Sequence, residues 1–337
     1  MKKNELLYNK LLEDHRIISD KIFNSEYIFF ESNEERKLTI QELKKKQIYI
    51  FKQIQEIINN DFKNIKNNKN YPDEKKLEGK VQKKIEEFEK ICVDLTHKLK
   101  NKFPFVDKNS KNKSLIVETR NLNHLEFVIK NTVQKLGDGW GHIIFCNLKN
   151  YDLIKKICDD ISENMEIKLL ENDLSRDTYN NLFLDINFWE QIDCEKVLVY
   201  QTDTFIYKNL DKEFLKYDWI GMIWNDEHTK FIENSKLKWK DLWGCNGGLN
   251  LRTVPVIKEI LKNNKLPEKI FKDTEKIQED MFFSWFIKNK YSFPKKDECK
   301  KFSNDKIFDE SIFGTHQPWN GSITDFIKFV KKIYNLN

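Results

Sequence analysis

The spacing of apolar residues changes about a third of the way along the chain. Up to about residue 100 they recur every three or four positions, which predicts amphipathic helices. A capping-box pattern of Thr39 and Glu42 opens one such segment, 39–62, and a second stripe with heptad-like spacing occupies residues 77–99. Together with a similar stripe of Leu7, Leu11, Ile18 and Ile22, these patterns predict a helical bundle or antiparallel coiled coil over residues 1–100. The ordinary role of such a region is packing or homo-oligomer formation.

Beyond a polar stretch, residues 101–114, which predicts a linker, short apolar runs alternate with helical patterns. This alternation predicts a domain over residues 115–337 with a mostly parallel α/β sheet flanked by helices. Ligands of such sheets bind at the carboxyl ends of the strands, so polar residues placed there are the first candidates for function. The expected strands are 115–119, 142–146, 166–170, 197–201, 219–224 and 248–252, and the expected helices include 124–134, 151–161 and one that ends at 261.

Composition excludes several classes of protein. The chain has 39% hydrophobic and 13% aromatic residues, too many for a disordered protein, and no apolar run approaches the roughly 18 residues of a membrane span. The net charge is +5, but residues 1–110 carry all of this surplus, so the other half lacks the basic face of a nucleic-acid binder. The amino terminus does not have the pattern of a signal peptide, and the six cysteines form no zinc motif. We therefore expect a cytoplasmic protein with reduced thiols.

The most informative polar group is Gln201-Thr202-Asp203, which directly follows the apolar run 197–200. An acid at the carboxyl end of a buried strand is a common functional group of α/β sheets, although aspartate also favours turns. Glu118-Thr119-Arg120 follows the first expected strand in the same way. Because arginine is scarce in this lysine-rich chain, Arg120 and Arg252 at strand ends suggest a need for the planar guanidinium. At Arg120, binding of a phosphate or base edge and a plain salt bridge are equally consistent with the sequence.

Three further groups lie in the same half of the chain. Asn246-Gly247-Gly248 predicts a loop whose backbone approaches a ligand closely or adopts positive φ, with a plain tight turn as the alternative. Glu279-Asp280 opens a helix, where acids are also favoured by the helix dipole. His316 lies in a segment that Pro318 and Trp319 fix as a loop, and a lone histidine is often structural.

Taken in order, an aspartate after a central strand, a glycine loop, an acid pair and a late histidine resemble the GT-A-fold glycosyltransferases. The pattern is most similar to a domain-of-unknown-function family that is assigned to this superfamily by its sequence. The resemblance covers about residues 113–325 and leaves the first hundred residues unassigned. It rests on the blocks IVETRNLNHLEFVIKN (116–131), GDGWGHIIF (137–145), YNNLFLDINFWE (179–190), VLVYQTDTF (197–205), YDWIGMIW (217–224), CNGGLNLR (245–252), EDMFF (279–283) and FGTHQPW (313–319).

The resemblance implies a GT-A-like, Rossmann-like fold and a set of site residues. Asp203 matches the second acid of a DxD motif and, with His316, would bind a divalent cation, Mn²⁺ or Mg²⁺. Asp280 would take the proton from the acceptor hydroxyl in an inverting transfer. The first acid of DxD is Gln201 here, a poor metal ligand, which weakens the expectation of metal dependence. The resemblance also implies nucleotide binding by Glu118, Thr119, Arg120, Gln201 and Thr202, and a donor and acceptor loop made by Asn246, Gly247, Gly248 and Glu279.

The resulting hypothesis is a metal-dependent glycosyltransferase that uses a nucleoside-diphosphate sugar, with a UDP-sugar as the favoured donor. The acceptor, whether glycan, protein or small molecule, is not specified by the sequence. Two alternatives stay open. Gln201 favours a non-catalytic protein of the same fold that binds a nucleotide or glycan, and residues 1–100 favour a helical scaffold with a passenger domain.

Overall fold

The computed structural model describes residues 74–99, 102–224, 243–263 and 278–336, together with Glu42 and Lys46. Glu42 and Lys46 are helical, but the rest of the predicted segment 39–62 lies outside the described residues. The chain divides into two compact units, Met1–Leu77 and Glu78–Asn337, and the fold below is that of the second unit. Whether residues 1–100 form a bundle therefore stays a prediction.

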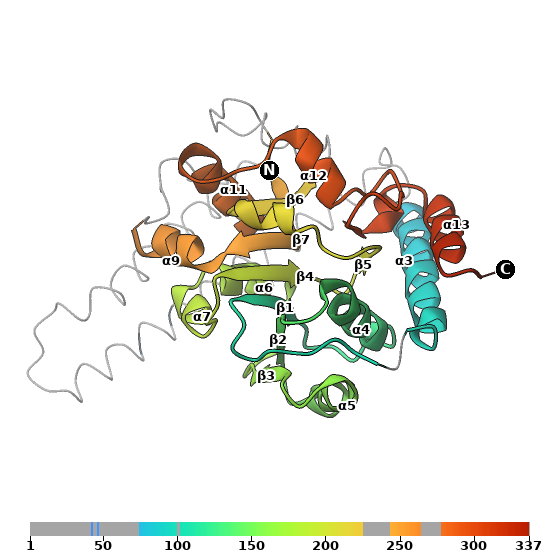
Figure 1. Cartoon of the computed structure of the whole chain (residues 1–337), viewed down its shortest axis with the longest axis horizontal. Coiled ribbons are helices and arrows are strands. Elements are labelled where there is room, and N and C mark those ends of the chain that lie inside the picture. Colours follow the sequence, from blue (N-terminus) through green and yellow to red (C-terminus); the bar gives the residue numbers. More distant parts are fainter. Residues whose placement is uncertain are drawn as a thin grey trace, which may run out of the picture. The chain divides into compact units, whose positions relative to one another are not determined.

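A six-stranded sheet in the order β3-β2-β1-β4-β7-β6 forms the centre of the second unit (Figure 1). Its first four strands are mutually parallel, and β7 runs antiparallel to both β4 and β6. The predicted mostly parallel α/β sheet is thus confirmed, with β7 as the strand of opposite direction. The strands are β1 (Asn112–Val117), β2 (Gly141–Cys146), β3 (Glu166–Leu169), β4 (Lys196–Tyr200), β6 (Trp219–Ile223) and β7 (Cys245–Thr253).

Strand β1 begins three residues earlier than expected, inside the polar stretch that predicts a linker. Two of its polar residues have partners on β2, the adjacent strand, and on β3, the next strand beyond it. Lys113 Nζ lies 2.5 Å from Glu166 Oε1 on β3, and Ser114 Oγ lies 2.7 Å from His142 Nδ1 on β2. Because both polar side chains are paired, they are tolerated at buried positions of a strand that their polarity alone disfavours.

Helices cover both faces of the sheet. Every residue of β2 and β4 is buried, which a strand achieves only when packing partners lie on both of its faces. Helix α5 packs on β2, helices α9 and α11 pack on β7, and α12 packs on β6. No helix among the described residues is long and apolar enough to cross a bilayer. The helices in this part are α4 (Leu125–Leu136), α5 (Tyr151–Ile161), α6 (Arg176–Phe183), α7 (Ile186–Glu190), α9 (Val254–Asn263), α11 (Glu279–Lys290) and α12 (Lys296–Phe302).

A second, two-stranded sheet lies beyond the carboxyl end of β4. Strands β5 (Thr204–Ile206) and β8 (Gly314–His316) pair antiparallel, with Thr204 opposite His316. The loop predicted around His316 is therefore wrong. A strand of three residues is too short to produce a periodic pattern, and it ends at His316, shortly before the turn η2 (Pro318–Asn320).

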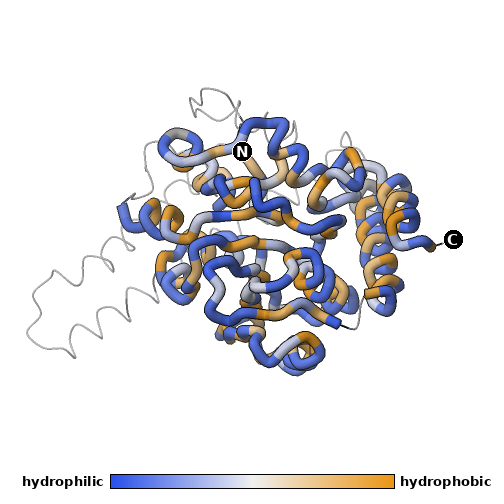
Figure 2. The backbone as a smooth tube through the Cα atoms, in the orientation of Figure 1, coloured by the Kyte–Doolittle hydropathy of each residue, from blue (hydrophilic) through white to orange (hydrophobic). Residues whose placement is uncertain are grey.

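Helix α3 (Glu74–Thr96) confirms the helix predicted by the stripe at residues 77–99. In its second half the stripe is buried: the ring of Phe88 meets the rings of His124, Trp319 and Phe326 at centroid distances of 6.0, 5.5 and 5.8 Å. Phe326 belongs to α13 (Ile323–Ile333), which lies beside α3 in Figure 1. Figure 2 shows hydrophobic and hydrophilic residues alternating around the turns of both helices, as expected of helices with one face against a core.

Candidate functional site

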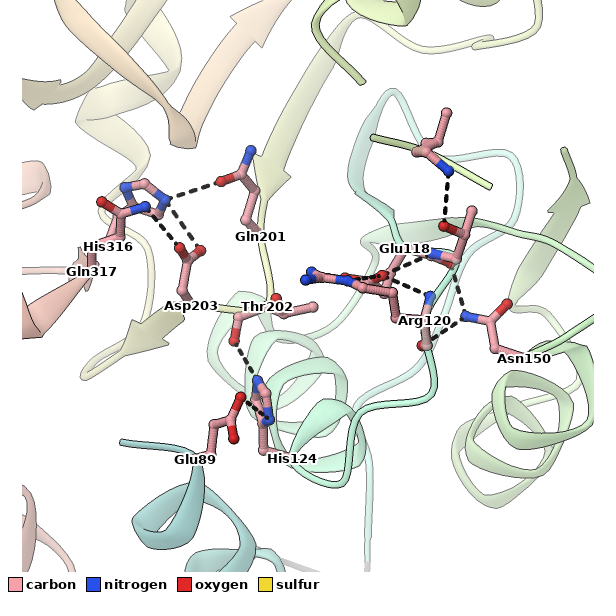
Figure 3. Close-up of polar contacts among 12 residues, drawn as sticks. Glu89, Glu118, Arg120, His124, Asn150, Gln201, Thr202, Asp203, His316 and Gln317 are labelled. Atoms are coloured by element: carbon pink, nitrogen blue, oxygen red, sulfur yellow. Dashed lines mark hydrogen bonds and ion pairs between the residues drawn. The ribbon is translucent and has the colours of Figure 1, made fainter. Parts of the chain in front are cut away.

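The predicted residues Gln201, Asp203 and His316 meet at the carboxyl end of β4 (Figure 3). Pairing of β5 with β8 brings His316 across from the turn that follows β4, although the two lie more than a hundred residues apart in the chain. His316 Nε2 lies 3.0 Å from Gln201 Oε1 and 3.1 Å from Asp203 Oδ1. Gln317, which the sequence did not single out, donates from its side-chain amide to Asp203 Oδ2 at 3.0 Å and from its backbone N–H to the carbonyl of Asp203.

The carboxylate of Asp203 has one oxygen that is not engaged. Oδ1 is buried and accepts no hydrogen bond in the described structure, because the nearby Nε2 of His316 is aligned with Gln201 instead. Burial alone would raise the pKa of Asp203, but the nearby imidazole of His316 and the hydrogen bond from Gln317 hold it below its ordinary value. Asp203 is therefore ionised at neutral pH, and its buried Oδ1 has no hydrogen-bond partner in the described structure.

These atoms fit a divalent cation of the expected kind. The amide oxygen of Gln201 and a carboxylate oxygen of Asp203 lie 3.0 and 3.1 Å from the same imidazole nitrogen of His316, and carboxylate and amide oxygens suit Mg²⁺ or Mn²⁺. Among the described residues no cluster of three or more His, Cys, Asp or Glu side chains suits a metal. Phosphate and water would have to supply the remaining ligands.

Asn246, Gly247 and Gly248 lie in strand β7 and not in a loop, so that expectation is wrong. Neither glycine has a positive φ, and their role is close approach. A Cβ on Gly248 would stand 2.1 Å from His316 Nε2, and one on Gly247 would stand 2.0 Å from Glu279 Oε1. These positions accept no side chain because the functional groups of β8 and α11 pack directly on the strand.

Arg252 pairs with Glu279 inside the fold. Its guanidinium is fully buried and makes two 3.0 Å bonds to the carboxylate of Glu279. It also stacks on Trp219 with 4.3 Å from Cζ to the ring centroid. Burial raises the pKa of Glu279 to about 7, and Arg252 opposes this rise. The planar guanidinium expected to be needed at Arg252 is thus used within the fold, in a two-bond pair with Glu279.

Asp280 is the other acid at the start of α11. Its Oδ2 accepts from the indole of Trp224 at 3.2 Å, and its Oδ1 accepts from the backbone N–H of Met281 at 2.8 Å. Burial raises the pKa of Asp280, and the bond from Trp224 opposes the rise. A carboxylate with a raised pKa and a fixed orientation is a competent proton acceptor near neutral pH.

Glu118, Thr119 and Arg120 follow β1, as predicted. Glu118 is buried and accepts from the backbone N–H groups of Thr119 and Arg120 at 2.9 and 2.8 Å. It also takes two bonds from the Arg120 guanidinium, at 2.9 and 2.7 Å. Of the two alternatives for Arg120, the structure contains the salt bridge. Asn150 fixes the loop by donating to the carbonyls of Glu118 and Arg120 (Figure 3).

Two adjoining cavities connect these groups. The larger, of about 730 Å³, contains Asp280, His316 and the β7 glycines in its wall, and the smaller, of about 270 Å³, contains Glu118, Arg120, Thr202 and Asp203. Three residues line both cavities: Arg176, Tyr179 and Gln201. All the site residues expected from the sequence therefore surround one composite site.

His124 is a further residue that sequence reasoning missed. It caps α4, is buried, and its Nε2 lies 3.2 Å from the carbonyl oxygen of Thr202 in the Gln201–Asp203 turn. Its Nδ1 lies 3.8 Å from Glu89 of α3, so helix α3 reaches the turn through this ring (Figure 3). Burial lowers the pKa of His124, which keeps the ring neutral. A histidine between an asparagine and an apolar helix carries no such signal in the sequence.

Comparisons with known proteins give one structural likeness and one family model. No curated protein matches the chain. A crystal structure of the galactosyltransferase LgtC in complex with donor and acceptor sugar analogs is similar at a TM-score of 0.45 and 13% identity, covering 67% of this chain and 96% of that one. The model of the family described as "Protein of unknown function (DUF5672)" matches residues 164–318. That range includes the Gln201–Asp203 turn, β7, Asp280 and His316, and this part of the chain is similar to that family.

Proposed function

We propose that this protein is a metal-dependent glycosyltransferase that transfers a sugar from a nucleoside-diphosphate sugar, with UDP-sugars as the first donors to test. One observation carries the proposal. Asp203 Oδ1, Gln201 Oε1 and His316 Nε2 converge at the carboxyl end of a central parallel strand, and the carboxylate oxygen among them is buried without a hydrogen bond. The motif order described from the sequence supports the same function.

In this proposal Asp203, His316 and Gln201 hold Mn²⁺ or Mg²⁺, which would stabilise the charge of the departing nucleoside diphosphate. The smaller cavity, beside Glu118 and Arg120, takes the nucleoside. The larger cavity takes the sugar and the acceptor. There Asp280 accepts the proton of the acceptor hydroxyl, which predicts inversion at the anomeric carbon.

Release of UDP from UDP-sugars, with and without Mn²⁺ or Mg²⁺, tests the proposal. Asp203→Asn preserves the shape of the side chain and removes its charge, so we expect it to abolish metal-stimulated release. Circular dichroism of the variant serves as the control for folding. Turnover that does not depend on metal would contradict the role of Asp203, and retention of anomeric configuration would contradict the role of Asp280.

A second candidate function follows from Gln201. Its amide oxygen is bonded to His316, and it leaves the cluster with one carboxylate instead of two. This arrangement favours a protein of similar fold that binds a nucleotide or glycan without reacting. Calorimetric binding of UDP in the absence of any transfer or sugar hydrolysis, over a panel of donors, would identify this class.

A further inference from the structure

The three arginines of the described residues differ in how their guanidinium groups are used. Arg120 gives two bonds to Glu118, and Arg252 gives two to Glu279. Arg176 makes no hydrogen bond or ion pair in the part of the chain that the structure describes. Arginine is scarce in this chain, with five among 59 Lys and Arg residues. The Arg176 side chain is exposed, and its guanidinium has N–H donors available for a ligand.

The position of Arg176 is equally distinctive. It begins α6, directly after the cap Ser175, and lines both cavities where they adjoin. Gln201 and Tyr179 share this position, and the hydroxyl of Tyr179 is buried without a hydrogen bond of regular geometry. A ligand that extends from one cavity into the other must pass these three side chains.

Acidic side chains outnumber free cationic ones in the walls of the two cavities. Asp203 faces the smaller cavity, and Asp177 and Asp280 face the larger one, while Glu118 and Glu279 are paired with their own arginines. Arg176 is the single lysine or arginine in the described wall of the larger cavity, and the single one in the smaller that is not already bonded to an acid. A diphosphate therefore meets three carboxylates, those of Asp177, Asp203 and Asp280, and the one guanidinium of Arg176 there.

We infer that Arg176 binds the diphosphate of the donor and neutralises part of its negative charge. This inference rests on the proposed function. Because Gln201 supplies no charge, a single carboxylate, that of Asp203, holds the cation, and the guanidinium offers two parallel N–H donors to phosphate oxygens.

Isothermal titration of the full-length protein with UDP and, separately, with inorganic pyrophosphate, both in the presence of Mn²⁺, tests the inference. Arg176→Ala should weaken the binding of both probes by about 10- to 100-fold, the effect of losing hydrogen bonds to a charged group. Arg176→Lys should recover part of the affinity, since it restores the charge without the fork. Lys331→Ala, which removes an exposed cation from α13, is the matched control and should bind as the wild type does.

Equal affinity of the wild type and Arg176→Ala for both probes would overturn the inference and leave the proposed function standing. Binding of pyrophosphate that depends on Arg176, without binding of UDP, would support the inference and contradict the proposed donor. If the wild-type protein binds neither probe, both the inference and the proposed function are wrong.

Discussion

Substitution of Gly248 tests the site most directly, because the added methyl group meets the His316 side chain. A methyl group at this position would overlap His316 Nε2, so Gly248→Ala must displace the imidazole from Asp203 and Gln201. We expect the affinity for Mn²⁺, measured by calorimetry in the presence of UDP, to fall by about tenfold or more, as for the loss of a metal ligand's support.

Gly79→Ala is the control for this substitution. Gly79 lies in α3 with open space around it, and alanine is favoured over glycine in helices. This variant should therefore keep its metal affinity and gain a little stability. Unchanged Mn²⁺ binding by Gly248→Ala would show that His316 does not act on the metal.

The pH dependence of activity depends on Asp280. Burial raises its pKa above the ordinary value of 3.8, so the ionised form that accepts a proton is lost at a higher pH than for an exposed aspartate. We expect the rate of transfer to decrease as the pH falls through this raised pKa, and to be constant above it. Asp280→Asn should abolish transfer at every pH while UDP binding persists. A pH profile that is flat down to the ordinary value would contradict Asp280 as the base.

At the residue scale, the sequence predicts which side chains surround the cavities better than it predicts their backbone conformation. The positions of Asp203, His316 and Asp280 beside the cavities could be predicted because a buried strand end, a motif order and a helix start are each visible in the sequence. Gln317 could not, because its role depends on a left-handed backbone (φ 54°) that turns its amide toward Asp203. The role inferred for Arg176 could not be predicted either, because a sequence does not show whether a guanidinium is already paired within the fold.

Among the structural elements, β7 and α11 are joined by one buried ion pair. Arg252→Met leaves the carboxylate of Glu279 buried without its counterion, which we expect to lower the free energy of unfolding by about 3–5 kcal/mol. In the double variant Arg252→Met/Glu279→Met no charge is left unpaired, so the loss should be much smaller. Urea unfolding monitored by tryptophan fluorescence measures both. Equal losses in the two proteins would mean that packing against Trp219, and not charge pairing, stabilises this contact.

Helix α4 contacts the Gln201–Asp203 turn through His124. Its imidazole is within hydrogen-bonding distance of the carbonyl of Thr202, so it restrains the backbone that carries Asp203. His124→Leu should weaken Mn²⁺ binding by about tenfold, whereas His124→Gln, which keeps a donor nitrogen, should retain most of the affinity. If both variants bind Mn²⁺ as the wild type does, the contact has only a structural role.

Elements with a long periodic pattern could be predicted with small errors in their bounds. Helix α5 has the expected ends, and β2 and β3 differ from expectation by one residue each. Strands β5 and β8 could not be predicted, because three residues form no pattern and their pairing depends on contact between distant segments. Yet this pairing brings His316 to the Gln201–Asp203 turn. The motif order points to His316, whereas the loop expected there is inferred from Pro318 and Trp319.

For the molecule as a whole, the two compact units predict where the chain can be divided. A protein that consists of residues 78–337 retains the buried face of α3 and should unfold cooperatively and bind UDP with Mn²⁺ as the full chain does. A protein of residues 101–337, divided at the boundary that the sequence suggests, lacks the buried side chains of Phe88, Cys92 and Leu95. Since burial of one large apolar side chain contributes about 1.5–3 kcal/mol, we expect this shorter protein to be strongly destabilised. Similar melting temperatures for the two fragments would place α3 outside the folding unit.

The contact between Phe88 and Phe326 also determines when the protein can finish folding during its synthesis. Helix α3 leaves the ribosome first, and α13, which covers it, is the last helix among the described residues. At about 5–20 residues per second, the apolar face of α3 waits on the order of 10–50 seconds for its partner. During that interval a nascent chain presents this face to chaperones and to other nascent chains, so a ribosome that stalls before α13 would release an aggregation-prone product.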